Sequence, residues 1–286
     1  MGSLSVLLAC PYTPQSETVN DKDGFLCNFW RAVQHDPTVV AHYANQPSHE
    51  STLHARHAWL VSQRTGLTMR LEGDPHYYDA KIAGWWCWGL CCWIGHGWCS
   101  GIGPWQVVER HLVRGKNGTG VISRQIPHMG GTYGPGRGIQ SLQARGEGIY
   151  TWMQDLCERL RYVRVTCGDW MRVLGPSVTY KQGITGIVLD PPYSHSERVK
   201  ELYAVEADIS AEVQAWCLKS GDNPLLRIVL CGLSGEYTLP GWRQVSWKKA
   251  NGGFSNQSCD QDNLNKYRER LYLSPHCLYP RKHRMP

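Results

Sequence analysis

The 286-residue sequence lacks the signals that send a protein out of the cytoplasm. Its opening stretch is apolar but has neither the basic start nor the cleavage site of a secretory signal peptide. Met1 and Gly2 begin a myristoylation pattern, yet Val6 stands where that pattern needs serine or threonine. These absences favour a cytoplasmic protein over a secreted or lipid-anchored one.

The sequence also has little that resembles a membrane span. Only the segment from Ile82 to Cys99 is apolar over about the length that a bilayer requires. Glycines and a histidine interrupt it, at Gly84, Gly89, Gly95, His96 and Gly97. We therefore expect a buried helix of a soluble domain here, and no membrane partner.

Cysteine is abundant, with 12 residues, but neither a disulfide framework nor a metal site is expected. The chain is long and has no secretory signal, so thiols scattered through apolar runs are typical of reduced, buried residues. One short segment gathers Cys87, Cys91, Cys92, His96 and Cys99. Structural zinc sites usually join two such groups, and a second one is not evident. The sequence therefore favours a packed helix without metal.

The charge balance is mildly basic, with 30 lysines and arginines against 24 aspartates and glutamates. This balance is compatible with a polyanionic partner but does not require one. The glycine-rich stretches 115–120 and 130–138 lack the lysine and hydroxyl residue that end a phosphate-binding loop. His54 and His57 follow a plausible helix N-cap at Ser51, and we expect both on a solvated helix face.

The most informative stretch is Asp190-Pro191-Pro192-Tyr193, which follows the apolar run 184–189. A short β-branched run is typical of a buried parallel strand, and functional residues of open α/β sheets lie just past strand carboxyl ends. Neither proline can donate a backbone hydrogen bond, so the strand ends in a stiff turn. Such a turn suits a flat ring that bears an amine, because Asp190 accepts from the amine and Tyr193 stacks on the ring.

Two further acidic residues follow expected strands. Asp169 comes after the apolar run 162–165, and Asp21 lies in the segment 17–23, which we expect to be a strand with an acidic tip, with Asp23 as the fallback. An aspartate at such a strand tip binds ribose hydroxyls in dinucleotide folds. Further elements expected are a helix at 149–160, a helix at 210–218, a strand at 225–231, and a final strand with its tail at 267–277.

On these motifs the chain resembles the Dam-like, N6-adenine-specific DNA methyltransferases. The resemblance implies that Asp190, Pro191, Pro192 and Tyr193 are catalytic and that S-adenosylmethionine is the cofactor. In that family the residue that matches Asp169 accepts from the adenine amine of the cofactor, and the residue that matches Asp21 binds the cofactor's ribose. Gly2 and Ser3 match the back half of the family's cofactor loop. The family's first strand and its earlier Pro-x-x-Gly-Gly-Lys segment have no counterpart in this sequence.

The resemblance implies an α/β fold, a Rossmann-like methyltransferase sheet with an inserted target-recognition region. We expect the cofactor side of the core at 1–70, the insertion at 71–150 and the catalytic part at 151–286. Basic residues of the insertion would then contact double-stranded DNA, with Lys116, Arg124 and Arg137 as candidates.

The predicted activity is methylation of a flipped adenine in duplex DNA, in the cytoplasm of a bacterial or phage-infected cell. No obligate protein partner is predicted. Two alternatives stay open: a cytosine-N4 methyltransferase, and a catalytically impaired DNA-binding relic of such an enzyme. Cytosine-N4 enzymes more often begin the signature with serine, so Asp190 favours adenine.

Overall fold

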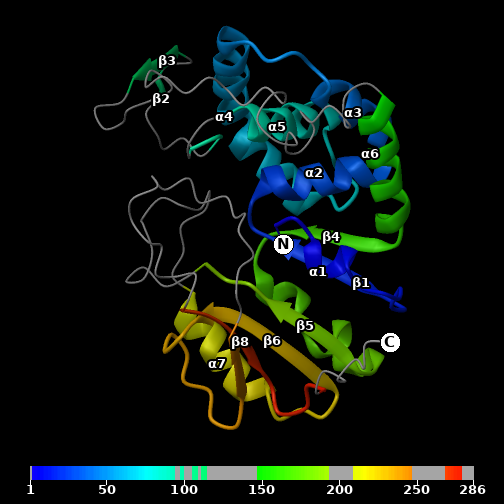
Figure 1. The fold of residues 1–286 in the computed structure, drawn as a ribbon, viewed down its shortest axis with the longest axis vertical. Coiled ribbons are helices and arrows are strands. Elements are labelled where there is room, and N and C mark those ends of the chain that lie inside the picture. Colours follow the sequence, from blue (N-terminus) through cyan, green and yellow to red (C-terminus); the bar gives the residue numbers. More distant parts are fainter. Residues whose placement is uncertain are drawn as a thin grey trace, which may run out of the picture. The chain divides into compact units, whose positions relative to one another are not determined.

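The computed structural model describes residues 2–93, 97–99, 105–108, 111–114, 147–192, 209–246 and 268–278. The chain divides into two compact units, Met1–Trp170 and Met171–Pro286. The three functional regions expected from the sequence divide the chain differently, and they stay predictions. Helices and strands occur in both units, so the protein is mixed α/β (Figure 1).

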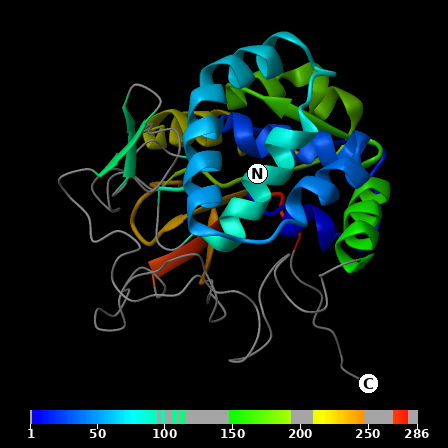
Figure 2. The ribbon, with the colours of Figure 1, turned by 90° about the horizontal axis from the view of Figure 1, so that it is seen from above.

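The first unit consists mainly of helices around a pair of parallel strands. Its helices are α1 (Ser5–Leu8), α2 (Gly24–His35), α3 (Pro37–Ala44), α4 (Glu50–Gly73), α5 (Ala80–Cys92) and α6 (Glu147–Leu160), of which α4 is the long helix of Figure 2. Its strands are β1 (Glu17–Asp21), β2 (Trp105–Val108), β3 (His111–Arg114) and β4 (Val163–Cys167). β1 pairs with β4 in parallel, and β2 pairs with β3 antiparallel.

The second unit contains a mixed four-stranded sheet in the order β5-β6-β8-β7. Its strands are β5 (Thr185–Leu189), β6 (Leu226–Leu233), β7 (Arg243–Ser246) and β8 (Glu269–Leu273), and its helix is α7 (Ser210–Ser220). Short 3-10 turns precede β5, namely η2 (Trp170–Val173), η3 (Pro176–Val178) and η4 (Tyr180–Gln182). β5 and β6 are parallel, whereas β8 runs antiparallel to both of its neighbours.

These elements confirm the predicted strand within 17–23, the predicted strands near 163, 185, 226 and 269, and the predicted helices at 149–160 and 210–218. β7 was not predicted. The predicted N-cap at Ser51 is wrong by two residues, because α4 begins at Glu50 and its N-cap is His49. Ser51 instead places its hydroxyl 2.9 Å from Nδ1 of His49.

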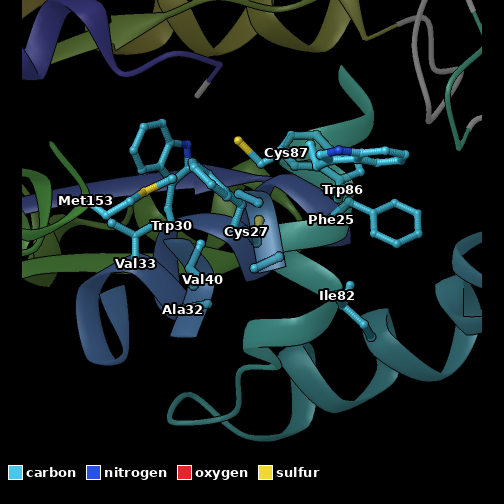
Figure 3. Close-up of a cluster of buried hydrophobic side chains, with 14 of the residues drawn as sticks. Phe25, Cys27, Trp30, Ala32, Val33, Val40, Ile82, Trp86, Cys87 and Met153 are labelled. Atoms are coloured by element: carbon cyan, nitrogen blue, oxygen red, sulfur yellow. The ribbon is translucent and has the colours of Figure 1, made fainter. Parts of the chain in front are cut away.

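The core of the first unit lies where α2, α3, α5 and α6 meet (Figure 3). α2 supplies much of it, because nine of its twelve residues are buried. Trp30 and Val33 of α2, Val40 of α3, Trp86 of α5 and Met153 of α6 all belong to this cluster. Burying a large apolar side chain contributes about 1.5–3 kcal/mol, so this cluster dominates the stability of the unit.

The predicted burial of the tryptophan-rich segment is confirmed over its helical part. α5 covers Ala80–Cys92, and Trp88 is fully buried. Asp79 begins the helix by accepting a hydrogen bond from the backbone N–H of Ile82 at 2.8 Å. No helix in the described part of the chain is long and apolar enough to cross a membrane.

The described cysteines form no disulfides.

Candidate functional site

Two of the predicted cofactor residues, Asp21 and Asp169, lie at the carboxyl end of one parallel strand pair. Asp21 is the last residue of β1 and is in register with Cys167, the last residue of β4. Asp169 follows two residues later, after Gly168. Gly168 has a φ of 125°, a conformation that favours glycine. Its N–H donates to the carbonyl of Asp21 at 2.9 Å, which ties the two strand ends together.

Local hydrogen bonds fix the loop that follows β1. The Asp21 carboxylate accepts from the N–H of Asp23 at 3.0 Å, and the Asp23 carboxylate accepts from the N–H of Phe25 at 2.9 Å. Asp23 is thereby the N-cap of α2. Burial raises the pKa of Asp23, while the hydrogen bond from Phe25 lowers it. Asp23 thus has a capping role, which leaves Asp21 as the better candidate for ribose hydroxyls.

Two thiols support these strand ends from the side of α2. Cys27 of α2 is hydrogen-bonded to Cys167 of β4, and this contact together with burial raises the pKa of Cys27. The same contact lowers the pKa of Cys167. Sγ of Cys27 also lies 3.4 Å from the carbonyl oxygen of Asp21. The position of Asp21 therefore depends on the packing of α2 against the strand pair.

Gly2 and Ser3, the remaining cofactor candidates, also belong to the first unit. The indole N–H of Trp30 donates to the carbonyl of Gly2 at 3.1 Å, and the hydroxyls of Ser3 and Ser5 are 2.5 Å apart. Gly2 has a φ of 53°, and Leu4 has a φ of 55° with a buried side chain. The segment is therefore anchored on α2.

Asp190 belongs to the second unit and directly follows β5. β5 and β6 are parallel, with Leu189 opposite Leu230. The residues that follow these two, Asp190 and Cys231, are therefore neighbours. The Cys231 thiol is hydrogen-bonded to Asp190. Burial, together with the charge of Asp190, raises the pKa of Cys231 to about 12, so Cys231 stays a protonated donor. Asp190 is exposed, and Pro191 and Pro192 are half-buried.

The sequence did not predict the role of Cys231, because that role depends on the register between β5 and β6. A possible signal was that Asp190 follows Leu189 and Cys231 follows Leu230, the two residues that face each other in the β5–β6 pair. Such neighbours lie side by side only if the strands are adjacent and parallel.

The structure therefore brings the site residues together in two sets. In the first unit, Asp21 and Asp169 lie at the carboxyl end of the β1–β4 pair. In the second unit, Asp190, Pro191 and Pro192 form the turn after β5. Four predicted site residues lie outside the described residues: Tyr193, Lys116, Arg124 and Arg137.

The expectation that His57 lies on a solvated helix face is wrong. Its side chain is fully buried, its ring stacks on Trp93 with centroids 4.7 Å apart, and its Nδ1 accepts from the N–H of Cys99 at 3.3 Å. The prediction failed because helical spacing does not reveal that the indoles of Trp93 and Trp98 cover this face. Within the described ranges, no three histidine, cysteine or acidic side chains are grouped to hold a metal ion.

Comparison of the chain with protein-family models finds no match, and comparison with curated protein sequences finds none either. The function is therefore inferred from the residues and their geometry.

Proposed function

We propose that this chain is an S-adenosylmethionine-dependent methyltransferase that acts on the exocyclic amine of a flipped adenine in duplex DNA. The observation that carries the proposal is the Asp190-Pro191-Pro192 turn at the carboxyl end of the parallel strand β5. Functional residues of parallel α/β sheets occupy this position. The proposal includes a Rossmann-like methyltransferase sheet, in which Asp21 and Asp169 serve the cofactor.

The turn offers two acceptors for an amine that carries two hydrogens. We assign one to the carboxylate of Asp190 and the other to the backbone carbonyl of Pro191. Accepting both hydrogens localises the nitrogen lone pair, which in adenine is delocalised into the ring. Cys231 is compatible with this role because its thiol stays protonated beside the Asp190 carboxylate.

The cofactor, when bound, supplies an electrophilic methyl group on a sulfonium centre. Transfer of that methyl group would form the nitrogen–carbon bond and leave the electron pair of the broken carbon–sulfur bond on sulfur, and one amine proton would pass to the Asp190 carboxylate that accepts from it. The protein contributes by holding the amine in line with the methyl group, and positioning of this kind supplies much of a rate enhancement.

The residues present at the carboxyl ends of β1 and β4 fit the cofactor. A carboxylate at a strand tip, as at Asp21, accepts hydrogen bonds from the two hydroxyls of a ribose. Gly168, with its positive φ, forms a tight turn before Asp169. A carboxylate after that turn can accept from the exocyclic amine of the cofactor's adenine.

The target base has to leave the duplex to reach these residues. Extruding a nucleotide costs roughly a few kcal/mol. Stacking on an aromatic side chain contributes about 1–3 kcal/mol per base, and we assign this stacking to Tyr193. Lys116, Arg124 and Arg137 remain the proposed contacts to DNA phosphates.

Calorimetry with S-adenosylmethionine tests the cofactor part of the proposal. We expect binding to the 286-residue chain, weakened roughly tenfold or more in Asp21→Ala and in Asp169→Ala because each loses hydrogen bonds to the ligand. Asp155→Ala is the matched control, since Asp155 is an exposed carboxylate on α6, and it should bind like the wild type.

Asp190→Ala separates the catalytic role from the cofactor site. It should lower methylation of duplex DNA roughly a hundredfold and leave cofactor affinity nearly unchanged. Absence of cofactor binding at millimolar concentration would favour a catalytically impaired, DNA-binding relic of such an enzyme. Methyl transfer to cytosine would favour a cytosine-N4 methyltransferase.

A further inference from the structure

Three side chains on one face of α2 line up along β4. Cys27, Arg31 and Gln34 are four and three residues apart, so they lie on the same side of the helix. Gln34 donates from Nε2 to the carbonyl of Val163 at 2.8 Å, and Arg31 donates from Nε to the carbonyl of Val165 at 2.9 Å. Side chains of α2 therefore close this edge of β4.

The same alignment brings Cys27 to Cys167. Four residues of a helix rise about 6 Å and two residues of a strand rise about 6.7 Å. The step from Arg31 back to Cys27 on the helix therefore matches the step between alternate residues of β4. The two thiols are hydrogen-bonded to each other, and both side chains are buried. Segments far apart in the sequence thus hold two thiols in direct contact.

The guanidinium of Arg31 makes the surroundings of this thiol pair positive. Arg31 is buried, and its further hydrogen bonds go to backbone carbonyls, those of Leu71, Asp74 and Tyr77. Burial lowers the pKa of Arg31, and the proximity of the two thiols opposes that effect. Backbone carbonyls carry no net charge, so the positive charge of Arg31 remains available to stabilise a thiolate.

The two thiols differ in how readily they lose a proton. The hydrogen bond from Cys27 lowers the pKa of Cys167, burial opposes this, and the charge of Arg31 lowers the pKa further. The contact with Cys167, together with burial, raises the pKa of Cys27. Cys167 therefore forms a thiolate more readily, and Cys27 stays the protonated donor. A thiol of lowered pKa beside a second thiol is typical of cysteines that react with oxidants.

We propose that Cys27 and Cys167 are a reversible disulfide site, which a peroxide closes and a dithiol opens. The bond would join α2 to β4 covalently within the first unit. The inference does not depend on methyl transfer.

The oxidation balances with hydrogen peroxide as the oxidant. The sulfur of the Cys167 thiolate attacks one peroxide oxygen, the O–O bond breaks, and the hydroxide that leaves takes up the proton that Cys167 gave up. The Cys27 sulfur then attacks the sulfur of the resulting sulfenic acid, and the hydroxyl group leaves as water with the Cys27 proton. Two thiols are thus oxidised to a disulfide while the peroxide is reduced to water.

Cys167 lies where a small oxidant can reach it by local opening. It is the last residue of β4, and Asp169, two residues later, is exposed. Opening the end of a strand costs less free energy than unfolding the whole unit. A molecule as small as hydrogen peroxide therefore needs only the end of β4 to open.

The disulfide would also change the surroundings of Asp21. The Cys27 thiol donates to the Asp21 carbonyl at 3.4 Å, and a disulfide has no proton to donate. Any effect of oxidation on cofactor binding rests on the proposed function, whereas formation of the disulfide does not.

Cys217 of α7 provides a matched comparison. Its side chain is fully buried, and burial alone raises its pKa to about 12. A thiol that is buried in this way reacts poorly with oxidants. If burial alone decided reactivity, the thiols of Cys27, Cys167 and Cys217 would be protected alike.

Peptide mapping of the full chain, without cofactor, tests the proposal. The reduced protein is exposed to hydrogen peroxide, its remaining thiols are blocked with N-ethylmaleimide, and tryptic peptides are identified by mass spectrometry without reduction. Trypsin places the two thiols in peptides 23–31 and 165–172, each of which has a single cysteine. We expect these peptides to be joined roughly tenfold or more faster than Cys217 is oxidised. Dithiothreitol should separate them again.

Three variants assign the steps to the two sulfurs. Cys27→Ser keeps a hydrogen-bond donor but removes the second sulfur, so Cys167 should stop at the sulfenic acid, which dimedone traps. Cys167→Ser should leave Cys27 unoxidised, because Cys27 stays protonated. Cys217→Ser should behave like the wild type. Circular dichroism checks that each variant is folded, and the wild-type map decides the matter even where a variant is not.

Three results would overturn the proposal. After peroxide treatment, N-ethylmaleimide could block Cys27 and Cys167 as completely as Cys217, which would show that the contact confers no reactivity. Disulfides from either thiol to other cysteines in equal yield would exclude a defined pair. Equally fast joining of the two peptides in denaturing urea would show that the fold does not promote the bond.

Discussion

At the scale of single residues, Asp190 has the Cys231 thiol as a neighbour. Cys231 holds a proton because burial and the neighbouring carboxylate both disfavour its thiolate. A thiol is an uncharged donor, so it leaves oxygen atoms of the Asp190 side chain able to accept from an amine. A lysine or arginine at this place would compete with a substrate amine for the same oxygen atoms.

His57 makes the stability of the first unit depend on pH. Burial lowers its pKa to about 4, and His54 and Arg64 add to the effect. The unfolded chain binds this proton near pH 6.5. Stability is therefore fully present above about pH 6.5 and falls as the pH is lowered toward 4, by on the order of 3 kcal/mol.

Urea denaturation between pH 7 and pH 4 measures this dependence. His57→Gln should lose part of the slope, whereas His42→Gln, at an exposed position on α3, should keep the wild-type slope. Identical slopes in the wild type and His57→Gln would contradict the assignment of the lowered pKa to His57.

At the scale of elements, glycines set the distance between helices. A Cβ added at Gly84 of α5 would lie 2.7 Å from the carbonyl oxygen of Val40 and would also meet Tyr43, both on α3. Gly66 of α4 has no atom within 4 Å of such a Cβ. The two positions therefore form a matched pair.

Gly84→Ala should destabilise the protein by about 1–3 kcal/mol, because the two helices have to move apart. Gly66→Ala should stabilise it by about 0.5–1 kcal/mol, because alanine loses less conformational entropy in a helix. Chemical denaturation monitored by circular dichroism checks both. A neutral Gly84→Ala would show that α3 and α5 are not in close contact in solution.

Elements were predictable from the sequence where the local pattern was strong. The β-branched runs before Asp169 and Asp190 gave both strands, and helical periodicity gave α6 and α7. β7 was missed, because its burial pattern shows no fully buried residue from Arg243 to Ser246. Its pairing depends on β8, which lies far from it in sequence.

The candidate site was predictable in part. The sequence placed Asp21, Asp169 and Asp190 at or just after the ends of strands, and the structure has them there. It could not give the partners of these residues, because Cys231 and Gly168 reach them through strand register. Nor could it show that Arg31 and Gln34 close the edge of β4, since these bonds join segments far apart in the chain.

At the scale of the whole molecule, the proposed chemistry is divided between two units. The first unit holds the residues proposed for the cofactor, and the second holds those proposed for the target amine. Loss of either set should abolish methyl transfer, but only loss of the first should abolish cofactor binding.

Nucleoside analysis by mass spectrometry tests the central claim most directly. Unmethylated duplex DNA is incubated with S-adenosylmethionine and the wild-type chain, Asp190→Ala or Glu212→Ala, the last carrying its change at an exposed carboxylate on α7. The account predicts N6-methyldeoxyadenosine with the wild type and Glu212→Ala, and roughly a hundredfold less with Asp190→Ala. No methylated adenine from the wild type, or equal amounts from Asp190→Ala, would contradict it.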